Sequence, residues 1–516
     1  MVAGRWGVAG VGVALVVGLA SYAPVRPATV VAAAPVLPQR LPGINAQFLP
    51  SPGNAAARGQ AFDRIRGIGV RMARIDGNWA DIEKTRGVYD WSSLDRQVNE
   101  LVAHGLSPRV ILDYSNTLYS TAGAAKQASG TPPIPPLGIG QPIYFPPDSP
   151  APFATWARAL AARYRGRVQS LEVWNEQNSG FRFWEPHEDP AAYGRLLKAT
   201  YMAVKAVAPE DQVAFGGTFY PAVDIAAANA YGIPIPNDPV AQQLGAPHQG
   251  TLTYITNAIA ADPTLPQYFD AMAYHPYHFP YMAPEVDIPV EGSLETSMVA
   301  VRALLDSYHL QAKPIWITEV GWPNNTAAYG ATVDKSASYL VRTYATGWAH
   351  GIQQIDWYCY GDGGSDSTYN QESAFGIVDG GGNPKPAFYA WQTLNRLVGT
   401  LPYAGSQASV LGLPADGRAP RFAAGGTAVT VVWLAPETMY TDQGALPVAS
   451  QELSVRTPPG TVAIYDMKGA ARPLGTTFTA SPYPVYLVQD LAALPSAPVR
   501  VGDVPGAVSP LPNTSR

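Results

Sequence analysis

Two apolar segments of the chain each end near a glutamate that has tryptophan close by. The first segment, Leu171–Asn178, contains Trp-Asn-Glu ending at Glu176, and the second, Pro314–Trp322, contains Glu319. Each segment has the length and composition of a buried β-strand, which places its glutamate near the carboxyl end of that strand. Two carboxyl groups that face each other across such strand ends can cleave a glycosidic bond.

This chemistry requires the two carboxyl groups to hold different protonation states. One group must be ionised, while the other must carry the proton that releases the leaving oxygen. The negative charge of the ionised group helps to keep the proton on its neighbour. A separation of roughly 5 to 5.5 Å predicts retention of the anomeric configuration, and roughly 6.5 to 9.5 Å predicts inversion.

The elements around this pair predict a closed barrel. Short apolar runs alternate with segments of helical periodicity, and eight strand-then-helix units over residues 44–400 predict an α/β fold, the (β/α)8 TIM barrel. A doubly wound open sheet is the alternative, although the first strand–helix turn lacks a G-x-G-x-x-G phosphate loop. In the barrel, the ends of the fourth and seventh strands, which carry Glu176 and Glu319, can face each other across the mouth. The predicted strands are Ile44–Phe48, Val70–Asp76, Pro108–Tyr114, Val168–Glu176, Val213–Phe219, Phe269–Tyr277, Pro314–Trp322 and Ile352–Tyr360.

Five short motifs fall at the ends of predicted strands or in the segment that follows the eighth strand. They are Trp174-Asn175-Glu176, Thr318-Glu319, Arg74–Trp79, Gly376–Asp379 and Lys385–Tyr389. Together they resemble the motifs of clan A retaining glycoside hydrolases, and the pair of glutamates at the fourth and seventh strands is the specific part of that resemblance. Within the clan, family 39 is the most similar because it also joins a barrel to a β-sandwich. The resemblance covers roughly residues 44–490.

The resemblance implies a role for each of three residues at the predicted site. Glu176 would be the acid/base, Glu319 the nucleophile, and Asn175 a donor to the 2-hydroxyl of the sugar. The alternative is that both glutamates are surface carboxylates at strand ends, and their joint position on these two strands argues against it.

Three further side chains are predicted to support the pair. His275 and Tyr277 share one face of the sixth strand because strand side chains alternate, so either could hydrogen-bond the nucleophile. Arg74, near the end of the second strand, could orient Glu319 and keep it ionised through charge-assisted hydrogen bonds. The alternative for His275 and Tyr277 is a fully hydrogen-bonded side chain beneath the cleft. The alternative for Arg74 is an ion pair with an aspartate at the barrel rim.

Tryptophans near the strand ends are candidate platforms for sugar rings, whose apolar C–H faces stack on aromatic side chains. Trp357 on the eighth strand is the best candidate. Trp79, Trp184 and Trp322 also fall near strand ends, and core packing is the alternative for these three.

Charge and cysteine content exclude several classes of site. The 516 residues include 34 Lys and Arg and 39 Asp and Glu, with the signs interspersed, so we expect no nucleic-acid partner. The single cysteine, Cys359, excludes an intramolecular disulfide and a cysteine zinc cluster. The oxygen-rich run Gly361–Asp366 lacks the spacing of a calcium loop and is predicted to be a flexible loop. We therefore predict no metal and no cofactor.

The ends of the chain differ in composition from the barrel. Residues 1–34 combine Arg5 with an uncharged apolar stretch and small residues, which predicts a signal peptide or a signal anchor and a secreted or cell-surface protein. No other segment is predicted to meet the membrane. Residues 35–43 form a predicted linker, 401–494 a small β-sandwich of alternating strands, and 495–516 a flexible tail.

The prediction is an exported retaining glycoside hydrolase that acts on an oligo- or polysaccharide. Two alternatives remain open: a non-catalytic carbohydrate-binding protein of the cell surface, and a transglycosylase on the same scaffold. The β-sandwich is predicted to be a structural buttress rather than a carbohydrate-binding domain. The sugar, its linkage, the exo or endo mode and the oligomeric state do not follow from the sequence.

Overall fold

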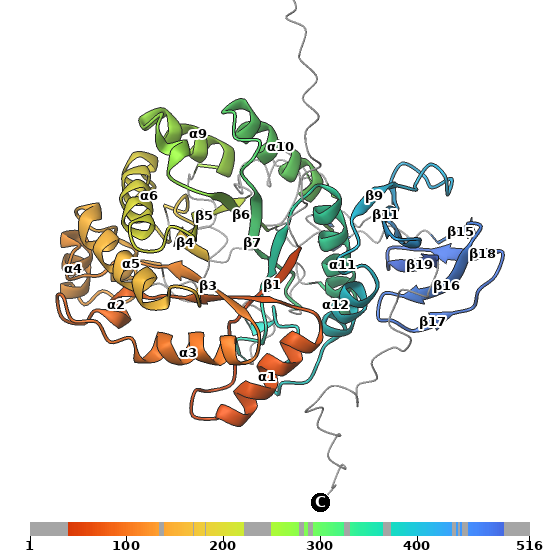
Figure 1. Cartoon of the computed structure of the whole chain (residues 1–516), viewed down its shortest axis with the longest axis horizontal. Helices are drawn as coiled ribbons and strands as arrows, with labels where there is room; N and C mark the ends of the chain where they lie inside the picture. Colours follow the sequence, from red (N-terminus) through yellow and green to blue (C-terminus); the bar gives the residue numbers. More distant parts are fainter. Residues whose placement is uncertain are drawn as a thin grey trace, which may run out of the picture. The chain divides into compact units, whose positions relative to one another are not determined.

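The barrel predicted from the sequence is present. In the computed structural model, eight parallel strands pair in chain order from β1 to β8, and β1 pairs with both β2 and β8, which closes the barrel (Figure 1). This closure excludes the open sheet. The structure describes residues 40–133, 139–168, 170–180, 182–220, 249–277, 283–286, 293–324, 331–364, 373–435, 440–441, 444–445 and 452–489. The predicted signal segment 1–34 and tail 495–516 lie outside the described residues, as do 365 and 366 of the predicted flexible loop.

The barrel strands are short and are buried on both faces. β4, β6 and β7 are buried along their whole length, as expected of parallel strands that have helices outside and packed side chains inside. β1 begins at Leu41, three residues before the predicted start of the barrel, because Leu41 already pairs with β8. The strands are β1 (Leu41–Asn45), β2 (Met72–Asp76), β3 (Ser107–Leu112), β4 (Ser170–Asn175), β5 (Gln212–Tyr220), β6 (Ala271–Pro276), β7 (Ile315–Val320) and β8 (Gln354–Trp357).

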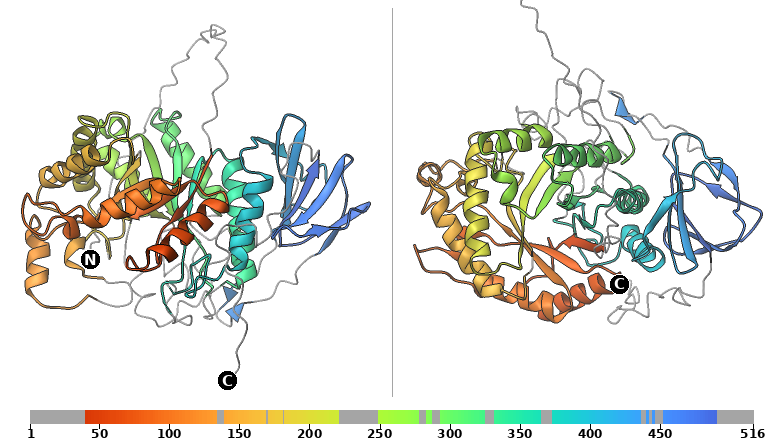
Figure 2. Two further views of the ribbon diagram at one scale, coloured as in Figure 1. Left: turned by 60° about the horizontal axis from the view of Figure 1, so that its bottom comes forward. Right: turned by 45° about the horizontal axis from the view of Figure 1, so that its top comes forward.

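Helices surround the strands (Figure 2), and side-chain caps define several of their starts. Asp189 accepts a hydrogen bond from the Ala192 amide at 2.9 Å, and Pro190 occupies the first turn of α6, where its missing N–H costs nothing. The helices are α1 (Ala55–Gly67), α2 (Trp79–Ile82), α3 (Ser92–Ala103), α4 (Thr121–Ala128), α5 (Pro150–Tyr164), α6 (Pro190–Lys205), α9 (Thr251–Ala261), α10 (Leu294–Ser307), α11 (Val333–Ala349) and α12 (Pro386–Leu397), with 3-10 turns at Pro142–Tyr144 and Leu265–Gln267.

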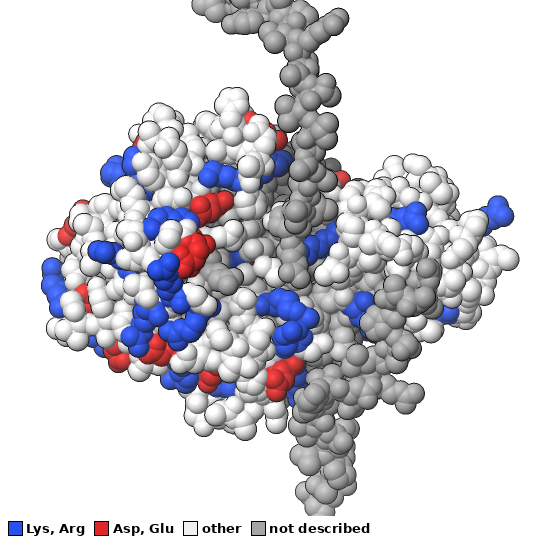
Figure 3. All heavy atoms as spheres, viewed as in Figure 1, with Lys and Arg blue, Asp and Glu red and all other residues white. Residues whose placement is uncertain are grey.

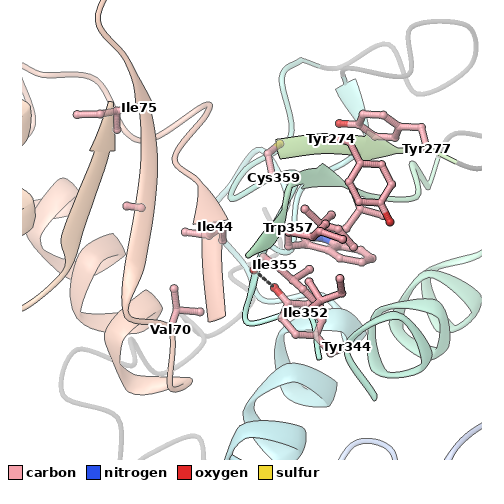
Figure 4. Packing of buried hydrophobic residues seen from close by; sticks show 14 of the residues in the cluster. Ile44, Val70, Ile75, Tyr274, Tyr277, Tyr344, Ile352, Ile355, Trp357 and Cys359 are labelled. Carbon is pink, nitrogen blue, oxygen red and sulfur yellow. Dashed lines mark hydrogen bonds between the residues drawn. The ribbon is translucent and has the colours of Figure 1, made fainter. Parts of the chain in front are cut away.

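The core joins the closing strands to the helices outside them. The Tyr344 hydroxyl of α11 donates to the carbonyl oxygen of Ile355 at 3.0 Å and lies 3.2 Å from that of Gly43, so it contacts both β8 and β1. Figure 4 shows Tyr344 beside Ile355 and Trp357, with Ile44 on the neighbouring strand. This contact fixes the seam at which the barrel closes.

The predicted C-terminal β-module is also present. Its main sheet has the order β17-β16-β19-β12-β11-β9, and the antiparallel pair β15–β18 packs on it through a shared apolar cluster that includes Val455, Phe478, Ile464 and Leu487. The strands are β9 (Tyr403–Ser406), β10 (Gly417–Arg418), β11 (Pro420–Ala424), β12 (Thr427–Leu434), β13 (Tyr440–Thr441), β14 (Gly444–Ala445), β15 (Leu453–Arg456), β16 (Thr461–Asp466), β17 (Ala471–Arg472), β18 (Thr477–Ala480) and β19 (Val485–Gln489).

The β-module is joined to the barrel by buried polar contacts as well as by apolar packing. Glu285, in the connection between β6 and α10, accepts hydrogen bonds from Arg342 Nε of α11 at 3.0 Å and from Trp433 Nε1 of β12 at 2.8 Å. Arg342 and Trp433 are almost completely buried. The Ser338 hydroxyl of α11 donates to the Pro482 carbonyl at 2.7 Å. The module is therefore fixed to one side of the barrel.

The outer surface has mixed charge. On the face shown in Figure 3, Lys and Arg lie interspersed with Asp and Glu over the barrel. Among the described helices, none combines the length and the apolar character that a membrane span requires.

Candidate active site

The two glutamates predicted to form the site lie together at the carboxyl ends of β4 and β7. Glu176 directly follows β4, Glu319 is the penultimate residue of β7, and each is 8% exposed. One carboxylate oxygen of each, together with a ring nitrogen of His275, lies within 4.8 Å of the others. Such a close approach of one oxygen from each group favours retention, for which the carboxyl groups lie roughly 5 to 5.5 Å apart, over inversion at roughly 6.5 to 9.5 Å.

The backbone at the end of β4 adopts an unusual conformation that positions Glu176. Trp174 has φ 71° and Glu176 has φ 48°, in the left-handed region that costs about 1–2 kcal/mol for a residue with a Cβ. Two hydrogen bonds hold this conformation: the Glu176 amide donates to the Gly217 carbonyl at 2.8 Å, and the Trp174 indole donates to the Phe183 carbonyl at 2.8 Å. Contacts from β5 and from the connection after β4 therefore stabilise this conformation, which sets the position of Glu176.

Glu319 is held by two donors. Arg74 Nη1 donates to Oε1 at 2.5 Å and the Tyr277 hydroxyl donates to Oε2 at 2.9 Å, while His275 Nδ1 lies 3.8 Å from Oε2. Burial by itself would raise the pKa of the Glu319 carboxyl, but the charges of His275 and Arg74 outweigh it and hold that pKa below its usual value. Glu319 is therefore ionised at neutral pH, as a nucleophile must be.

Arg74 uses every donor that it has. Besides Glu319, its guanidinium bonds both oxygens of Glu172 at 2.9 and 3.1 Å, the Asn45 side-chain oxygen at 2.9 Å and the Asn175 side-chain oxygen at 2.9 Å. These five hydrogen bonds match the five N–H groups of arginine. The ion pairs of Arg74 thus go to Glu172 and Glu319, and the alternative of a rim aspartate as its salt-bridge partner is not observed.

His275 bonds the other glutamate. Its Nδ1 lies 2.9 Å from Glu176 Oε1, and its Nε2 lies 3.0 Å from the Thr318 hydroxyl, which donates to Glu172 Oε1 at 3.0 Å. Burial would lower the pKa of His275, but the charge of Glu319, the nearby carboxylate of Glu172 and the hydrogen bond to Glu176 raise it from 6.5 to about 9. The ring is therefore an imidazolium at neutral pH, with a donor directed at Glu176.

The sequence did not predict that His275 and Tyr277 would bond different glutamates. Either was expected to reach the nucleophile, and it is Tyr277 that bonds Glu319, while His275 bonds Glu176. Asn175, predicted to bind the sugar 2-hydroxyl, is 6% exposed, and its Nδ2 lies 3.1 Å from the Tyr114 hydroxyl. The Arg74 contact to its oxygen fixes the amide orientation and leaves a second N–H on Nδ2 for a ligand.

The tryptophans predicted as sugar platforms are buried, and this prediction is corrected. Trp79, Trp322 and Trp357 are each 0% exposed. The Trp79 ring stacks on Tyr119 with centroids 5.0 Å apart, and Trp322 stacks on Trp357 at 5.7 Å. Aromatic side chains cover one another at these strand ends, so each ring is packed instead of exposed. The half-buried aromatic side chains near the pair are Tyr114, Phe219 and Tyr358.

Glu172, a central residue of the site, was not assigned from the sequence. It is 0% exposed and accepts hydrogen bonds from Arg74, Thr318 and the Gly217 amide. Burial would raise its pKa, but Arg74 and His275 hold that pKa far below the usual value. The available signal was a charged residue in the middle of an otherwise buried strand, because such a residue must face a partner inside the barrel.

The same three groups form a set that could hold a metal ion, and their existing contacts speak against one. Glu319 is already occupied by a guanidinium and a phenol, and a protonated His275 has no lone pair to offer. The donor set fits an ionised carboxylate beside a second carboxyl group better than it fits a metal centre.

No protein-family model matches this sequence, and no curated protein matches it. Solved structures share the fold, a TIM barrel followed by a β-module, which is the fold of family 39 glycoside hydrolases as the resemblance implied. One is a family 39 glycoside hydrolase from the gut symbiont Bacteroides cellulosilyticus WH2, with TM-score 0.64 and 20% identity over 87% of this chain and 81% of that one. The family 39 enzyme of Xanthomonas axonopodis pv. citri has TM-score 0.56 and 18% identity over 87% and 93% of the two chains. A monomeric β-xylosidase of Caulobacter crescentus CB15 has TM-score 0.56 and 17% identity over 88% and 98%.

Proposed function

We propose that this protein is a retaining glycoside hydrolase that is exported and acts on an oligo- or polysaccharide. The observation that carries the proposal is the close approach of Glu176 and Glu319, which have carboxylate oxygens within 4.8 Å of each other at the barrel mouth. The unequal surroundings of the two groups support distinct roles, because Arg74 and Tyr277 bond Glu319, whereas His275 bonds Glu176.

In the first step, the ionised carboxylate of Glu319 forms a bond to the anomeric carbon as the glycosidic C–O bond breaks. Glu176 gives its proton to the departing oxygen, which leaves as an alcohol. Arg74 and Tyr277 keep the attacking carboxylate ionised and oriented before the substrate arrives.

In the second step, Glu176 is a carboxylate and takes a proton from water as the water oxygen attacks the anomeric carbon. The ester bond to Glu319 breaks, so that Glu319 is again ionised and Glu176 again protonated. The donor from His275 Nδ1 at 2.9 Å stabilises Glu176 during the interval in which it is ionised.

β-Xylosides and β-glucosides are the first substrates to test. Solved structures with this fold include a β-xylosidase, a glucosidase from Croceicoccus marinus and a family 30 endoxylanase from Clostridium papyrosolvens C71. Export is proposed from the composition of residues 1–34. An enzyme outside the cell would meet polymeric glycans directly.

The experiment is hydrolysis of aryl glycosides and polysaccharides by purified protein lacking residues 1–34. Glu319→Ala should abolish turnover, and Glu176→Gln should slow substrates with poor leaving groups far more than those with good ones. Glu210→Gln is the control, because Glu210 pairs with Arg165 on the surface. Azide should rescue a Glu176→Ala variant and give a glycosyl azide with the substrate's configuration. Full activity of Glu319→Ala, or a first product of inverted configuration, would contradict the proposal.

A further inference from the structure

A crevice of about 600 Å³ lies between the connection after β1 and the connection after β8. Both connections follow the carboxyl ends of their strands, so the crevice is on the same end of the barrel as the candidate active site. Its floor and walls include side chains of α1 and α12. Neither of the paired glutamates and none of their hydrogen-bonding partners lines it, so it is separate from the site described above.

An aromatic side chain stands at the edge of this crevice with part of its ring uncovered. Phe48 is 43% exposed and has φ 56°, a left-handed conformation that costs free energy for a residue with a Cβ. The preceding residue is anchored, since the Gly361 amide donates to the Gln47 carbonyl at 3.3 Å and Gln47 Nε2 donates to Asp76 at 2.9 Å. The backbone on this side of Phe48 is therefore fixed. Tyr360, Phe388 and Tyr389 add further aromatic surface.

The polar lining contains both paired and unpaired groups. Asp362 is bonded by Lys385 at 2.6 Å, Asp379 accepts amide hydrogen bonds within its own turn, and Arg64 donates to the Gly382 carbonyl at 2.7 Å. In contrast, Gln60 of α1 and Gln392 of α12 make no side-chain hydrogen bond within the described part of the chain. The amides of both glutamines are therefore available to a ligand, and each offers donors and an acceptor.

From this lining we infer that the crevice binds an uncharged saccharide, as a second carbohydrate site beside the catalytic pair. A partly exposed ring that can stack on a sugar face, with free amides to bond hydroxyls, is the combination that recognises a neutral sugar. The charged side chains named above balance in sign, with Arg64 and Lys385 against Asp362 and Asp379, which disfavours an anionic or cationic ligand. The inference extends the proposed function, because a glycan held here would be anchored next to the mouth in which it is cleaved.

The test separates binding in the crevice from catalysis. In a Glu319→Ala background, which prevents hydrolysis, binding of xylohexaose, cellohexaose, mannohexaose and laminarihexaose is measured by calorimetry and saturation-transfer NMR. Phe48→Ala and Gln392→Leu should each weaken binding of the recognised hexasaccharide about tenfold or more. Tyr403→Ala is the matched control, because Tyr403 is an aromatic residue of the β-module with 41% exposure.

With Glu319 intact, both crevice variants should hydrolyse a small aryl glycoside at the parent rate and should melt at the parent temperature. Unchanged hexasaccharide affinity in both variants, or no binding of any of the four probes, would overturn the inference. Loss of aryl-glycoside hydrolysis in folded variants would also overturn it, since the crevice would then be part of the catalytic site. If the parent hydrolyses nothing while Phe48→Ala still loses hexasaccharide binding, the proposed function fails and the second site stands.

Discussion

Replacing Tyr277 by phenylalanine removes the hydroxyl that donates to Glu319 and keeps the aromatic ring. The Tyr277 ring packs near Tyr358 at 6.4 Å and Phe375 at 6.1 Å between centroids, and phenylalanine retains these contacts. What is lost is the hydroxyl donor 2.9 Å from Glu319 Oε2, in a residue that is 9% exposed. The substitution therefore isolates the contribution of this donor to the ionisation of Glu319.

The magnitude follows from the kind of hydrogen bond. A hydrogen bond to a charged group contributes about 1.5–3 kcal/mol, and one pKa unit corresponds to about 1.4 kcal/mol. The bond stabilises the ionised form and helps to hold the pKa of Glu319 below its usual value. Its loss should raise that pKa by about 1 to 2 units. Because the ionised carboxylate is the reactive form, the acidic limb of kcat/KM should move to higher pH by the same amount.

The assay is the pH dependence of kcat/KM on an activated aryl glycoside, which reports the pKa values of the free enzyme. Tyr201→Phe is the matched control, because the Tyr201 hydroxyl bonds Asp270 at 3.3 Å beside α6 and is remote from the two glutamates. An acidic limb that stays in place, or moves to lower pH, in a folded Tyr277→Phe protein would refute the assignment of Glu319 as the group that must be ionised.

Three further outcomes follow from the buried network. Glu172→Gln should lower the pKa of His275 from about 9 toward its usual value, because it removes a negative charge that is linked to His275 through the Thr318 hydroxyl. NMR titration of the imidazole measures this pKa, and an unchanged value would contradict the prediction. The raised pKa of His275 also predicts how the free energy of unfolding depends on pH. The contribution of His275 is fully present below about pH 6.5 and is lost, on the order of 3 kcal/mol, as the pH rises through about 9. Urea unfolding at several pH values should show this decrease, and His275→Asn should flatten it. Gly217→Ala should destabilise the protein by about 2 kcal/mol or more and reduce activity, since a Cβ at this position would overlap His275 and Glu172. The control is Gly53→Ala, whose added Cβ meets only a serine hydroxyl at 3.8 Å. Equal melting temperatures of the two variants would refute the prediction.

The barrel and its pair of glutamates were predictable because both depend on short-range pattern. Strand-length apolar runs alternate with helical periodicity, and once eight such units close, the ends of the fourth and seventh strands converge. The positions of Glu176 and Glu319 follow from that geometry. Arg74 and Tyr277 were also predicted as candidate partners of Glu319, and both bond it. The bond from His275 to Glu176 was not predicted, because the left-handed residues Trp174 and Glu176 turn the end of β4 away from regular strand alternation.

The burial of individual side chains was harder to predict than their positions along the strands. Trp322 and Trp357 fall at strand ends, as expected, yet each covers the other, and a sequence does not state which of two neighbouring rings faces solvent. Glu172 was missed for a related reason. A lone charge in an apolar strand signals a buried partner, but Arg74 lies 98 residues away and becomes that partner only when the barrel closes.

The contact between Glu285, Arg342 and Trp433 limits how the barrel and the β-module can be exchanged between related proteins. Removing residues beyond 400 would leave Glu285 without the Trp433 donor and would expose apolar surface on α11. The barrel is therefore not expected to be stable as a separate fragment. Losing a hydrogen bond to a buried charged group costs about 1.5–3 kcal/mol, a sizeable share of the stability of an ordinary domain. Barrel and β-module should therefore melt in one transition, resist separation by proteases, and be exchanged between relatives only as a single block.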